Sequence, residues 1–180
     1  MSDGARPAGQ LDLRSFIRDV PDFPRPGVLF RDITPLLQDA AAFRQVIDDF
    51  TAYLRPRSVE AVVGIESRGF LFGAPVAYNL GVPFVPVRKA GKLPAERMSV
   101  EYALEYGQGQ LDIHADGLRP GQRAALVDDL LATGGTAEAA ARLIEMLGAE
   151  VVSVLFVVVL DDLGGMQRLA GRDVHALIHY

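Results

Sequence analysis

The spacing of hydrophobic positions predicts two helices in the first third of the chain. Apolar residues recur at helical spacing from residue 11 to residue 20, before Pro21 ends the pattern. The same spacing returns over 39–54 and predicts a longer helix. The segment 23–37 between them combines prolines and a glycine with apolar residues, so we expect an ordered loop there.

Compact apolar runs then alternate with helical patterns through the rest of the chain. Compact apolar runs predict four strands, at 59–65, at 82–90, at the start of the segment that begins "RAALVDDLLATGG" at residue 123, and at 151–160. The segments 66–81 and 136–147 predict helices, and Gly81 and Gly148 are suited to cap their C-terminal ends. Alternation of this kind predicts an α/β fold, a mostly parallel sheet flanked by helices on both faces, with right-handed crossovers.

The segment 91–122 is too long to be a simple strand-to-helix connection. Polar and apolar residues alternate in "MSVEYALEY" and again in "GQLDIH", which predicts a two-stranded β-flap that serves as a lid. Residues 1–10 are polar and predict a flexible arm. We therefore expect one domain over 11–180, with the lid insertion at about 91–122.

Composition excludes several classes of function. The 180 residues include 18 basic and 23 acidic side chains without a basic cluster, so we expect no nucleic-acid partner and no attraction to acidic lipid. The chain has no cysteine, which rules out disulfides and thiolate metal sites and fits a reducing compartment. The longest apolar run is too short to span a membrane and the N-terminal residues lack an apolar leader, so we expect a cytoplasmic protein.

The segment "VDDLLATGGT" at 127–136 carries the strongest chemical signal. Backbone N–H groups of residues 133–136, at the start of a predicted helix, form a nest suited to a phosphate. Asp128 and Asp129 would repel that phosphate, so we expect them to face sugar hydroxyls or a cation. The loop lacks the lysine of a P-loop and the spacing of a dinucleotide fingerprint. Acids and loop together therefore indicate a ribose 5-phosphate.

"ALVDDLLATGGT" also resembles the phosphoribosyl-pyrophosphate loop of the type I phosphoribosyltransferases. Four further segments, "FPRPGVLFRDITPLL", "GIESRGFLFG", "VPVRKAGKLP" and "LEYG", are similar to the adenine phosphoribosyltransferases, in the same order and at similar spacing. The resemblance covers roughly residues 22–170. It implies transfer of a phosphoribosyl group from phosphoribosyl pyrophosphate to adenine, giving AMP and pyrophosphate.

The resemblance assigns roles to individual residues around the sugar and its phosphates. Asp128 and Asp129 would take the ribose hydroxyls, and Mg²⁺, held mainly by the substrate, would lie near them. The 5-phosphate would be bound by Ala132, Thr133, Gly134, Gly135 and Thr136. The pyrophosphate would be bound by Ser67, Arg68, Arg88, Lys89 and Lys92. The family often has a strained peptide before the residue corresponding to Ser67, and Arg68 would act in catalysis by neutralising the leaving group.

The resemblance also implies an adenine site and an acid–base residue. The backbone of Leu29 and Arg31 would read the edge of adenine, and Phe30 and Leu160 would sandwich the ring. Glu105 in "LEYG" corresponds to the family's proposed acid–base carboxylate near adenine N7, with Tyr106 beside it. One departure is that Val159 stands where the family usually has an acidic residue.

The family resemblance implies a homodimer, with "FPRPGVLFRD" near the interface. Two other functions remain open from the sequence. One is a phosphoribosyltransferase for another purine, against which "FRD" and "LEYG" argue. The other is a nucleotide-sensing regulator, which would need a second functional surface, and the chain has no basic extension to supply one.

Overall fold

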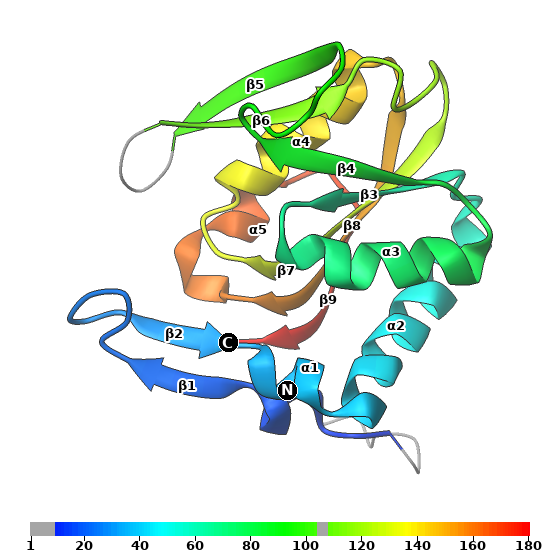
Figure 1. Ribbon diagram of the computed structural model, residues 1–180. Helices are drawn as coiled ribbons and strands as arrows, with labels where there is room; N and C mark the ends of the chain where they lie inside the picture. The colour runs from blue at the N-terminus through cyan, green and yellow to red at the C-terminus, as the bar shows by residue number, and fades with distance from the viewer. Residues whose placement is uncertain (1–9, 104–107) are drawn as a thin grey trace. The chain divides into compact units, whose positions relative to one another are not determined.

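The structure, a computed structural model, describes residues 10–103 and 108–180. The chain divides into two compact units, one ending at Asp48 and one spanning Asp49–Tyr180 (Figure 1). The boundary falls within helix α2, Ala40–Leu54. Each unit is described by itself below, and the predicted domain bounds of 11–180 stay a prediction.

A β-hairpin is the main feature of the N-terminal unit. A 3₁₀ helix, η1, spans Leu13–Phe16, and strands β1, Arg18–Pro21, and β2, Leu29–Asp32, then pair antiparallel. Arg18 and Asp32 form an ion pair of 2.6 Å across the hairpin. The prediction of one helix over 11–20 is therefore wrong beyond Phe16, because partners from a distant segment stabilise the extended backbone.

Two helices follow the hairpin. Helix α1, Thr34–Gln38, lies where the sequence predicted only an ordered loop, and it has a proline in its first turn, where a missing N–H costs nothing. Helix α2 confirms the prediction over 39–54. The Asp39 carboxylate caps it by accepting hydrogen bonds from the backbone N–H groups of Ala41, at 3.0 Å, and Ala42, at 2.9 Å.

The second unit is built on a seven-stranded sheet in the order β5-β6-β4-β3-β7-β8-β9. The strands are β3 Ala61–Ile65, β4 Phe84–Lys89, β5 Arg97–Ala103, β6 Gln108–His114, β7 Arg123–Leu131, β8 Glu150–Val159 and β9 Val174–His179. The helices are α3 Arg68–Leu80, α4 Gly135–Met146, α5 Gly165–Arg168 and the 3₁₀ segments η2 Arg55–Arg57 and η3 Asp161–Leu163. The five strands from β4 to β9 in this order pair in parallel, which confirms the predicted mostly parallel α/β fold.

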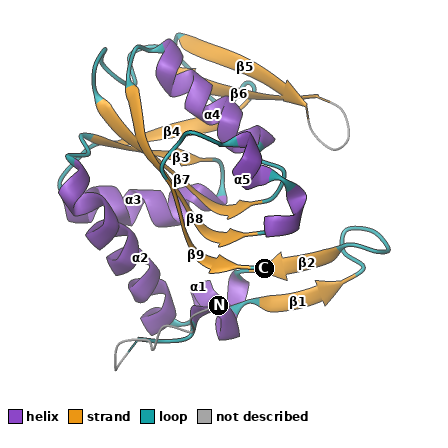
Figure 2. Cartoon of the chain, turned by 180° about the vertical axis from the view of Figure 1, so that it is seen from behind, coloured by secondary structure: helices purple, strands orange, loops and turns teal. Residues whose placement is uncertain are grey.

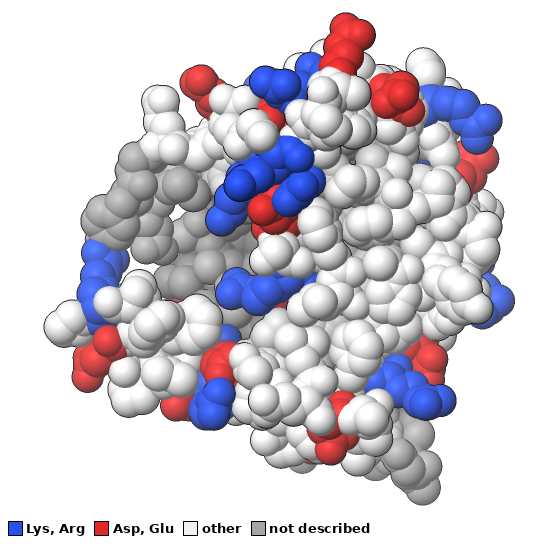
Figure 3. Space-filling view, in the orientation of Figure 1, with Lys and Arg blue, Asp and Glu red and all other residues white. Residues whose placement is uncertain are grey.

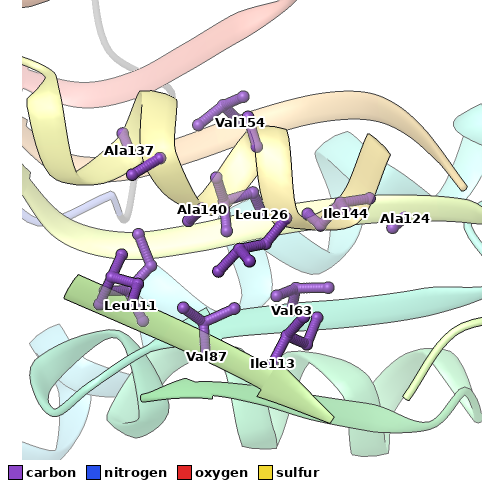
Figure 4. Packing of buried hydrophobic residues seen from close by; sticks show 14 of the residues in the cluster. Val63, Val87, Leu111, Ile113, Ala124, Leu126, Ala137, Ala140, Ile144 and Val154 are labelled. Atoms are coloured by element: carbon purple, nitrogen blue, oxygen red, sulfur yellow. The ribbon is translucent and has the colours of Figure 1, made fainter. Parts of the chain in front are cut away.

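Helices α3 and α4 cover opposite faces of this sheet (Figures 1 and 2). All five residues of β3 are buried, as expected for a strand covered on both faces. On one face, Ala140 and Ile144 of α4 point toward Leu126 of β7 and belong to one apolar core (Figure 4). On the other face, α3 approaches β3 closely, since a Cβ atom at Gly73 would lie 3.5 Å from a methyl group of Val62.

The predicted flap is an extension of the sheet. Strands β5 and β6 pair antiparallel, and β6 pairs antiparallel with β4. Val100, Leu111 and Ile113 are buried in the core that α4 covers. The base of the insertion is therefore fixed by the same apolar packing as the parallel strands, and its function as a lid stays a prediction.

Strand β9 was missed in the sequence. It pairs in parallel with β8 at the edge of the sheet, with Val154 opposite Val174. Its segment, "VHALIH", carries two histidines and does not form the continuous apolar run expected for a buried strand. Across residues 10–103 and 108–180, the longest apolar helix falls short of what a membrane crossing needs.

Candidate functional site

A pocket of about 400 Å³ opens at the carboxyl ends of the parallel strands in the second unit. Ligands of open α/β sheets bind at this edge, because the loops that follow neighbouring strands meet there. Glu66 follows β3, Lys89 ends β4 and Ala132 follows β7. The lining comprises Glu66, Ser67, Arg68, Lys89, Tyr102, Leu111, Asp128–Thr136 and Ala137. The structure thus brings together nearly all of the residues predicted for ribose and phosphates.

The loop of residues 132–136 leads directly into helix α4. Gly134 is the N-cap residue and has φ of 81°, a conformation that costs a side-chain-bearing residue energy. Gly134 has no side chain with which to cap this helix, so the first N–H groups of α4 would be available to a ligand. The arrangement suits an anion such as a phosphate, which the helix dipole also favours.

Helix α5 packs against this loop. The sequence patterns did not predict this contact. A Cβ atom at Gly165 would lie 2.3 Å from the carbonyl oxygen of Ala132, so only glycine allows the approach. Arg168, at the end of α5, forms an ion pair of 3.4 Å with Glu138 in the first turn of α4. The consecutive glycines 164 and 165 were the available signal in the sequence.

The acid pair lies at the end of β7 beside this loop. Asp129 is buried, with 4% of its surface exposed, and its carboxylate contacts the Arg68 Nε atom at 2.5 Å. The Asp128 carboxylate accepts a hydrogen bond of 2.9 Å from the Asp129 N–H group. Burial, together with the adjacent charge of Asp129, raises the pKa of Asp128 well above its ordinary value. A cation or hydroxyl donors in the pocket would therefore stabilise the charged pair.

Glu66 and Ser67 form the turn between β3 and α3, and Arg68 is the first residue of α3. The peptide bond between Glu66 and Ser67 is cis, at the position where the family resemblance implies an unusual peptide. A Cβ atom at Gly69 would lie 2.6 Å from the carbonyl oxygen of Val127, so glycine lets the start of α3 approach β7. This close packing holds Arg68 over the acid pair.

Glu66 is a pocket residue that the sequence reasoning did not select. Its carboxylate accepts hydrogen bonds of 3.1 Å from the Arg88 Nε atom and from the Lys89 N–H group. Burial alone would raise the pKa of Glu66, but these two hydrogen bonds and the charge of Arg88 outweigh it and lower the pKa. Glu66 is thus an anion that fixes the predicted pyrophosphate ligands.

The end of β4 and the turn after it carry three predicted cations, Arg88, Lys89 and Lys92, of which only Lys89 lines the pocket. Arg88 does not line the pocket. It pairs with Glu66 and donates a hydrogen bond of 3.0 Å to the Lys92 carbonyl oxygen. Figure 3 shows lysine and arginine side chains gathered over the C-terminal end of β4, beside acidic ones. Positive charge is therefore concentrated on the side of the pocket where a leaving pyrophosphate is expected.

Comparison with known proteins identifies the family. Residues 37–172 match the phosphoribosyl transferase domain family. An adenine phosphoribosyltransferase from Cyanothece sp. is 55% identical over 170 residues, which cover 94% of this chain and 100% of the relative. The chain belongs to the adenine phosphoribosyltransferase family.

Solved structures of adenine phosphoribosyltransferases share its fold. The enzyme from Thermoanaerobacter pseudethanolicus matches with a TM-score of 0.90 and 52% identity, over 93% of this chain and 98% of that one. The Saccharomyces cerevisiae enzyme, in a complex with adenine and an imino-altritol bisphosphate, matches with a TM-score of 0.88 and 41% identity, over 92% and 96% of the two chains.

Several residues that the adenine phosphoribosyltransferase resemblance selected are not in this pocket. Leu29, Phe30 and Arg31 belong to the N-terminal unit, where Phe30 packs edge-to-face on Phe23 with ring centroids 5.2 Å apart. Leu160 follows β8 and donates its N–H group to the Leu131 carbonyl oxygen at 2.9 Å. Their roles in adenine binding stay predictions.

Glu105 and Tyr106 lie outside the described residues, so the acid–base assignment made for the adenine phosphoribosyltransferases stays a prediction here. The neighbouring Tyr102, on β5, does line the pocket. Its ring faces Gly109 on β6, where a Cβ atom would lie 2.8 Å from the ring. Gly109 therefore makes room for the Tyr102 ring, and the sequence reasoning missed this pair.

The acid pair could also contribute to a metal site. Among residues 10–103 and 108–180, no group of three or more histidine, cysteine, aspartate or glutamate side chains is arranged to hold a metal ion. Two adjacent carboxylates, one with a raised pKa, are nevertheless hard oxygen donors of the kind that Mg²⁺ prefers. The donor set of this adenine phosphoribosyltransferase family member fits an ion that takes most of its ligands from a bound substrate.

Proposed function

We propose that the protein catalyses adenine phosphoribosyl transfer through this pocket. Adenine and phosphoribosyl pyrophosphate would give AMP and pyrophosphate, with inversion at the anomeric carbon. The observation that carries the proposal is the pocket itself. It places an uncapped helix N-terminus, an acid pair and cationic side chains around one cavity of sufficient size for the sugar and its phosphates.

The bond changes define what the pocket must do. A bond forms between an adenine nitrogen and the anomeric carbon, the bond from that carbon to pyrophosphate breaks, and adenine loses a proton. Positive charge develops on the ribose ring and negative charge on the leaving group, so catalysis needs charge stabilisation more than a strong nucleophile. Asp128, Asp129, Arg68 and Lys89 line the pocket. In this proposal the two aspartates would bind the ribose hydroxyls, and Arg68 and Lys89 would bind the leaving group.

The loop of residues 132–136 would hold the opposite end of the substrate. Its uncapped N–H groups would bind the 5-phosphate, so that the reactive carbon is fixed between two anchored ends. Mg²⁺, when bound with the substrate beside Asp128 and Asp129, would neutralise phosphate and hydroxyl oxygens. Arg68 contacts Asp129 through its Nε atom, so the N–H groups of its two Nη atoms would be available to the pyrophosphate.

The remaining parts of the proposal come from the family resemblance. Leu29, Phe30, Arg31 and Leu160 would bind adenine, Lys92 would assist pyrophosphate binding, and the enzyme would act as a homodimer in the cytoplasm. Closure of the flap would exclude water, which could otherwise hydrolyse the substrate. Each of these statements depends on the relatives rather than on contacts within the described residues.

An ultraviolet assay of adenine consumption with phosphoribosyl pyrophosphate and Mg²⁺ tests the reaction directly. We expect AMP and pyrophosphate in equal amounts. Competition with hypoxanthine and xanthine tests the base, because a transferase for another purine would consume these in preference to adenine. A protein that binds AMP but consumes no adenine would instead be a nucleotide-sensing regulator, and the proposal would be wrong.

Glu105→Gln tests the acid–base role. We expect kcat to fall by about a hundredfold or more, the usual contribution of a positioned acid–base group, while the dissociation constants of both substrates stay nearly unchanged. Single-turnover rates and equilibrium binding measure the two effects separately. The control is Glu101→Gln, an exposed carboxylate on β5, which should behave as the wild type. A wild-type kcat in Glu105→Gln would remove the assignment.

A further inference from the structure

Asp112 is a charged residue with 0% of its surface exposed, and the chemistry described above does not use it. Burying a carboxylate costs free energy unless hydrogen bonds and opposite charge replace the lost water. It lies on β6, between Leu111 and Ile113, which point into the apolar core. Alternation along the strand therefore directs Asp112 to the face of β6 away from α4.

The Asp112 carboxylate accepts hydrogen bonds from both flap strands. Its Oδ1 atom accepts from the Ser99 hydroxyl and from the Gln110 side-chain amide, each at 2.8 Å. Its Oδ2 atom contacts the Arg97 Nε atom at 3.2 Å. These contacts replace the hydration of the buried charge and tie β5 to β6 through side chains as well as backbone.

The fourth donor comes from a different segment. The Gly91 N–H group, in the turn after β4, donates to Asp112 Oδ2 at 3.2 Å. In the same turn, the Lys92 N–H group donates to the Lys89 carbonyl oxygen at 3.3 Å. The segment that carries Lys89 and Lys92 is thus attached to flap strand β6 twice, by backbone pairing at Arg88 and Lys89 and by the hydrogen bond from Gly91 to the Asp112 side chain.

The opposite side of this turn is attached to the pocket. Glu66 accepts hydrogen bonds from Arg88 and Lys89, and Arg88 donates to the Lys92 carbonyl oxygen. The cationic segment therefore lies between two carboxylates, Glu66 at the pocket and Asp112 within the flap. Loss of the Asp112 carboxylate would remove the side-chain contact that holds Gly91, while the backbone pairing of Arg88 and Lys89 with β6 would remain.

The hydrogen bond from Gly91 is strongest when the Asp112 carboxyl is ionised. Burial alone would raise the pKa of Asp112, but the hydrogen bonds from Gln110, Ser99 and Gly91 and the charge of Arg97 outweigh it, and the pKa is lowered. The group is therefore ionised at neutral pH. A hydrogen bond from Gly91 to a carboxylate is stronger than one to a neutral amide oxygen.

We propose that Asp112 is a positioning residue for the transfer reaction. It joins the turn after β4, which contains Gly91, to the flap strands. Lys89 and Lys92 would then be held in fixed positions relative to the pyrophosphate. Within the described residues, the Asp112 carboxylate is bonded to Gly91, Arg97, Ser99 and Gln110, none of which lines the pocket, so the side chain acts through the turn. The inference rests on the proposed function, because it assigns the purpose of the turn to pyrophosphate binding.

Asp112→Asn tests the proposal. The amide removes the charge and replaces one acceptor oxygen with a donor, so either Gly91 or a flap donor loses its partner. We expect the dissociation constant of magnesium pyrophosphate, measured by calorimetry, and the KM of phosphoribosyl pyrophosphate to rise about tenfold or more. The KM of adenine should stay unchanged. The Gly91 amide proton resonance should move upfield as its hydrogen bond weakens.

Two further variants separate positioning from folding. Asp116→Asn makes the same charge change at an exposed site in the turn after β6, and should match the wild type in every measurement. Ser99→Ala removes a single donor and leaves the carboxylate charged. It should fold as the wild type and raise the same two constants by about threefold, which keeps the proposal testable if Asp112→Asn fails to fold.

The outcomes are distinct. A pyrophosphate dissociation constant that stays within about twofold of the wild type in both Asp112→Asn and Ser99→Ala would overturn the proposal. So would a loss of activity that only follows the folded fraction, with unchanged constants in the folded protein. If the wild type neither binds pyrophosphate nor consumes adenine, the proposed function is wrong and this inference falls with it.

Discussion

Two adjacent aspartates in the pocket have different surroundings. Asp129 is neutralised by Arg68 at 2.5 Å, whereas burial and the charge of Asp129 raise the pKa of Asp128. A bound cation or hydroxyl donors would favour ionised Asp128, so ligand binding and its deprotonation are coupled. Because a raised carboxyl pKa means that the charged form is lost early on acidification, affinity for the substrate should begin to fall at a higher pH than it would for a carboxyl with an ordinary pKa.

Asp128→Asn tests this coupling. We expect the KM of phosphoribosyl pyrophosphate to rise about tenfold at neutral pH, since a charge-assisted hydrogen bond is lost, and to become nearly independent of pH in the weakly acidic range. Initial rates of adenine loss over that range measure both effects. The exposed Asp116→Asn variant should keep the wild-type pH profile. If Asp128→Asn keeps the wild-type profile too, another group controls the pH dependence.

The sequence was most informative where one short segment carried both the acid pair and the loop expected to bind phosphate. Asp128, Asp129 and residues 133–136 were selected from residue type and order, without the resemblance, and they line one pocket. Glu66 and Gly165 could not be selected, because their roles depend on Arg88 and on the Ala132 carbonyl oxygen, which the fold brings from other elements. Local sequence patterns cannot predict roles that depend on contacts between distant segments.

Among the elements, the predictions failed where tertiary partners override local preference. The four buried strands and helices α2, α3 and α4 were found, because their apolar patterns match their burial. The segment 18–21 looked helical by spacing, but it pairs with β2 through backbone hydrogen bonds and the ion pairs of Arg18 and Arg31. Such cross-strand stabilisation cannot be read from one strand alone.

Asp32 gives a test of that hairpin. Hydrogen bonds from Thr34, followed by those from Arg18, lower the pKa of Asp32 from 3.8 to about 2. A depressed carboxyl pKa stabilises the folded state above the unfolded pKa, and this stability is lost as pH falls through about 2. Because solvent screens the site, we expect a contribution of about 1 kcal/mol at neutral pH.

Asp32→Asn should therefore lower the free energy of unfolding by about 1 kcal/mol at neutral pH and by much less near pH 2. Urea denaturation at several pH values measures the difference between variant and wild type. Asp48→Asn, at an exposed position of α2, is the matched control and should show no such pH dependence. A difference that stays constant down to pH 2 would show that the Asp32 charge does not stabilise the hairpin.

In the second unit as a whole, the parallel sheet gathers residues that are far apart in the chain. Glu66, Lys89 and Asp129 follow or end three separate strands, yet all line one pocket. The pocket combines two kinds of binding group, the uncapped backbone of α4 and the charged side chains at the ends of β3, β4 and β7. These groups should respond differently to removal of a metal ion.

Thermal unfolding separates the two contributions. With Mg²⁺ and phosphoribosyl pyrophosphate at about a hundred times the dissociation constant, Tm should rise by about 5–10 °C. A chelator should remove most of that rise, because the acid pair then faces the ribose hydroxyls and pyrophosphate without a compensating cation. Ribose 5-phosphate should give a smaller rise that the chelator leaves unchanged, since backbone N–H groups bind its phosphate without a metal.

The Asp128→Asn/Asp129→Asn double variant is the control for this experiment. It should weaken but not abolish the response to ribose 5-phosphate, because the aspartates would bind its hydroxyls and the loop its phosphate, and it should lose the chelator-sensitive part of the response to phosphoribosyl pyrophosphate. The opposite result, a chelator that abolishes both responses, would mean that a metal ion holds the 5-phosphate. In that case the uncapped start of α4 would not be the phosphate site, and the two ends of the substrate would have to be reassigned within the pocket.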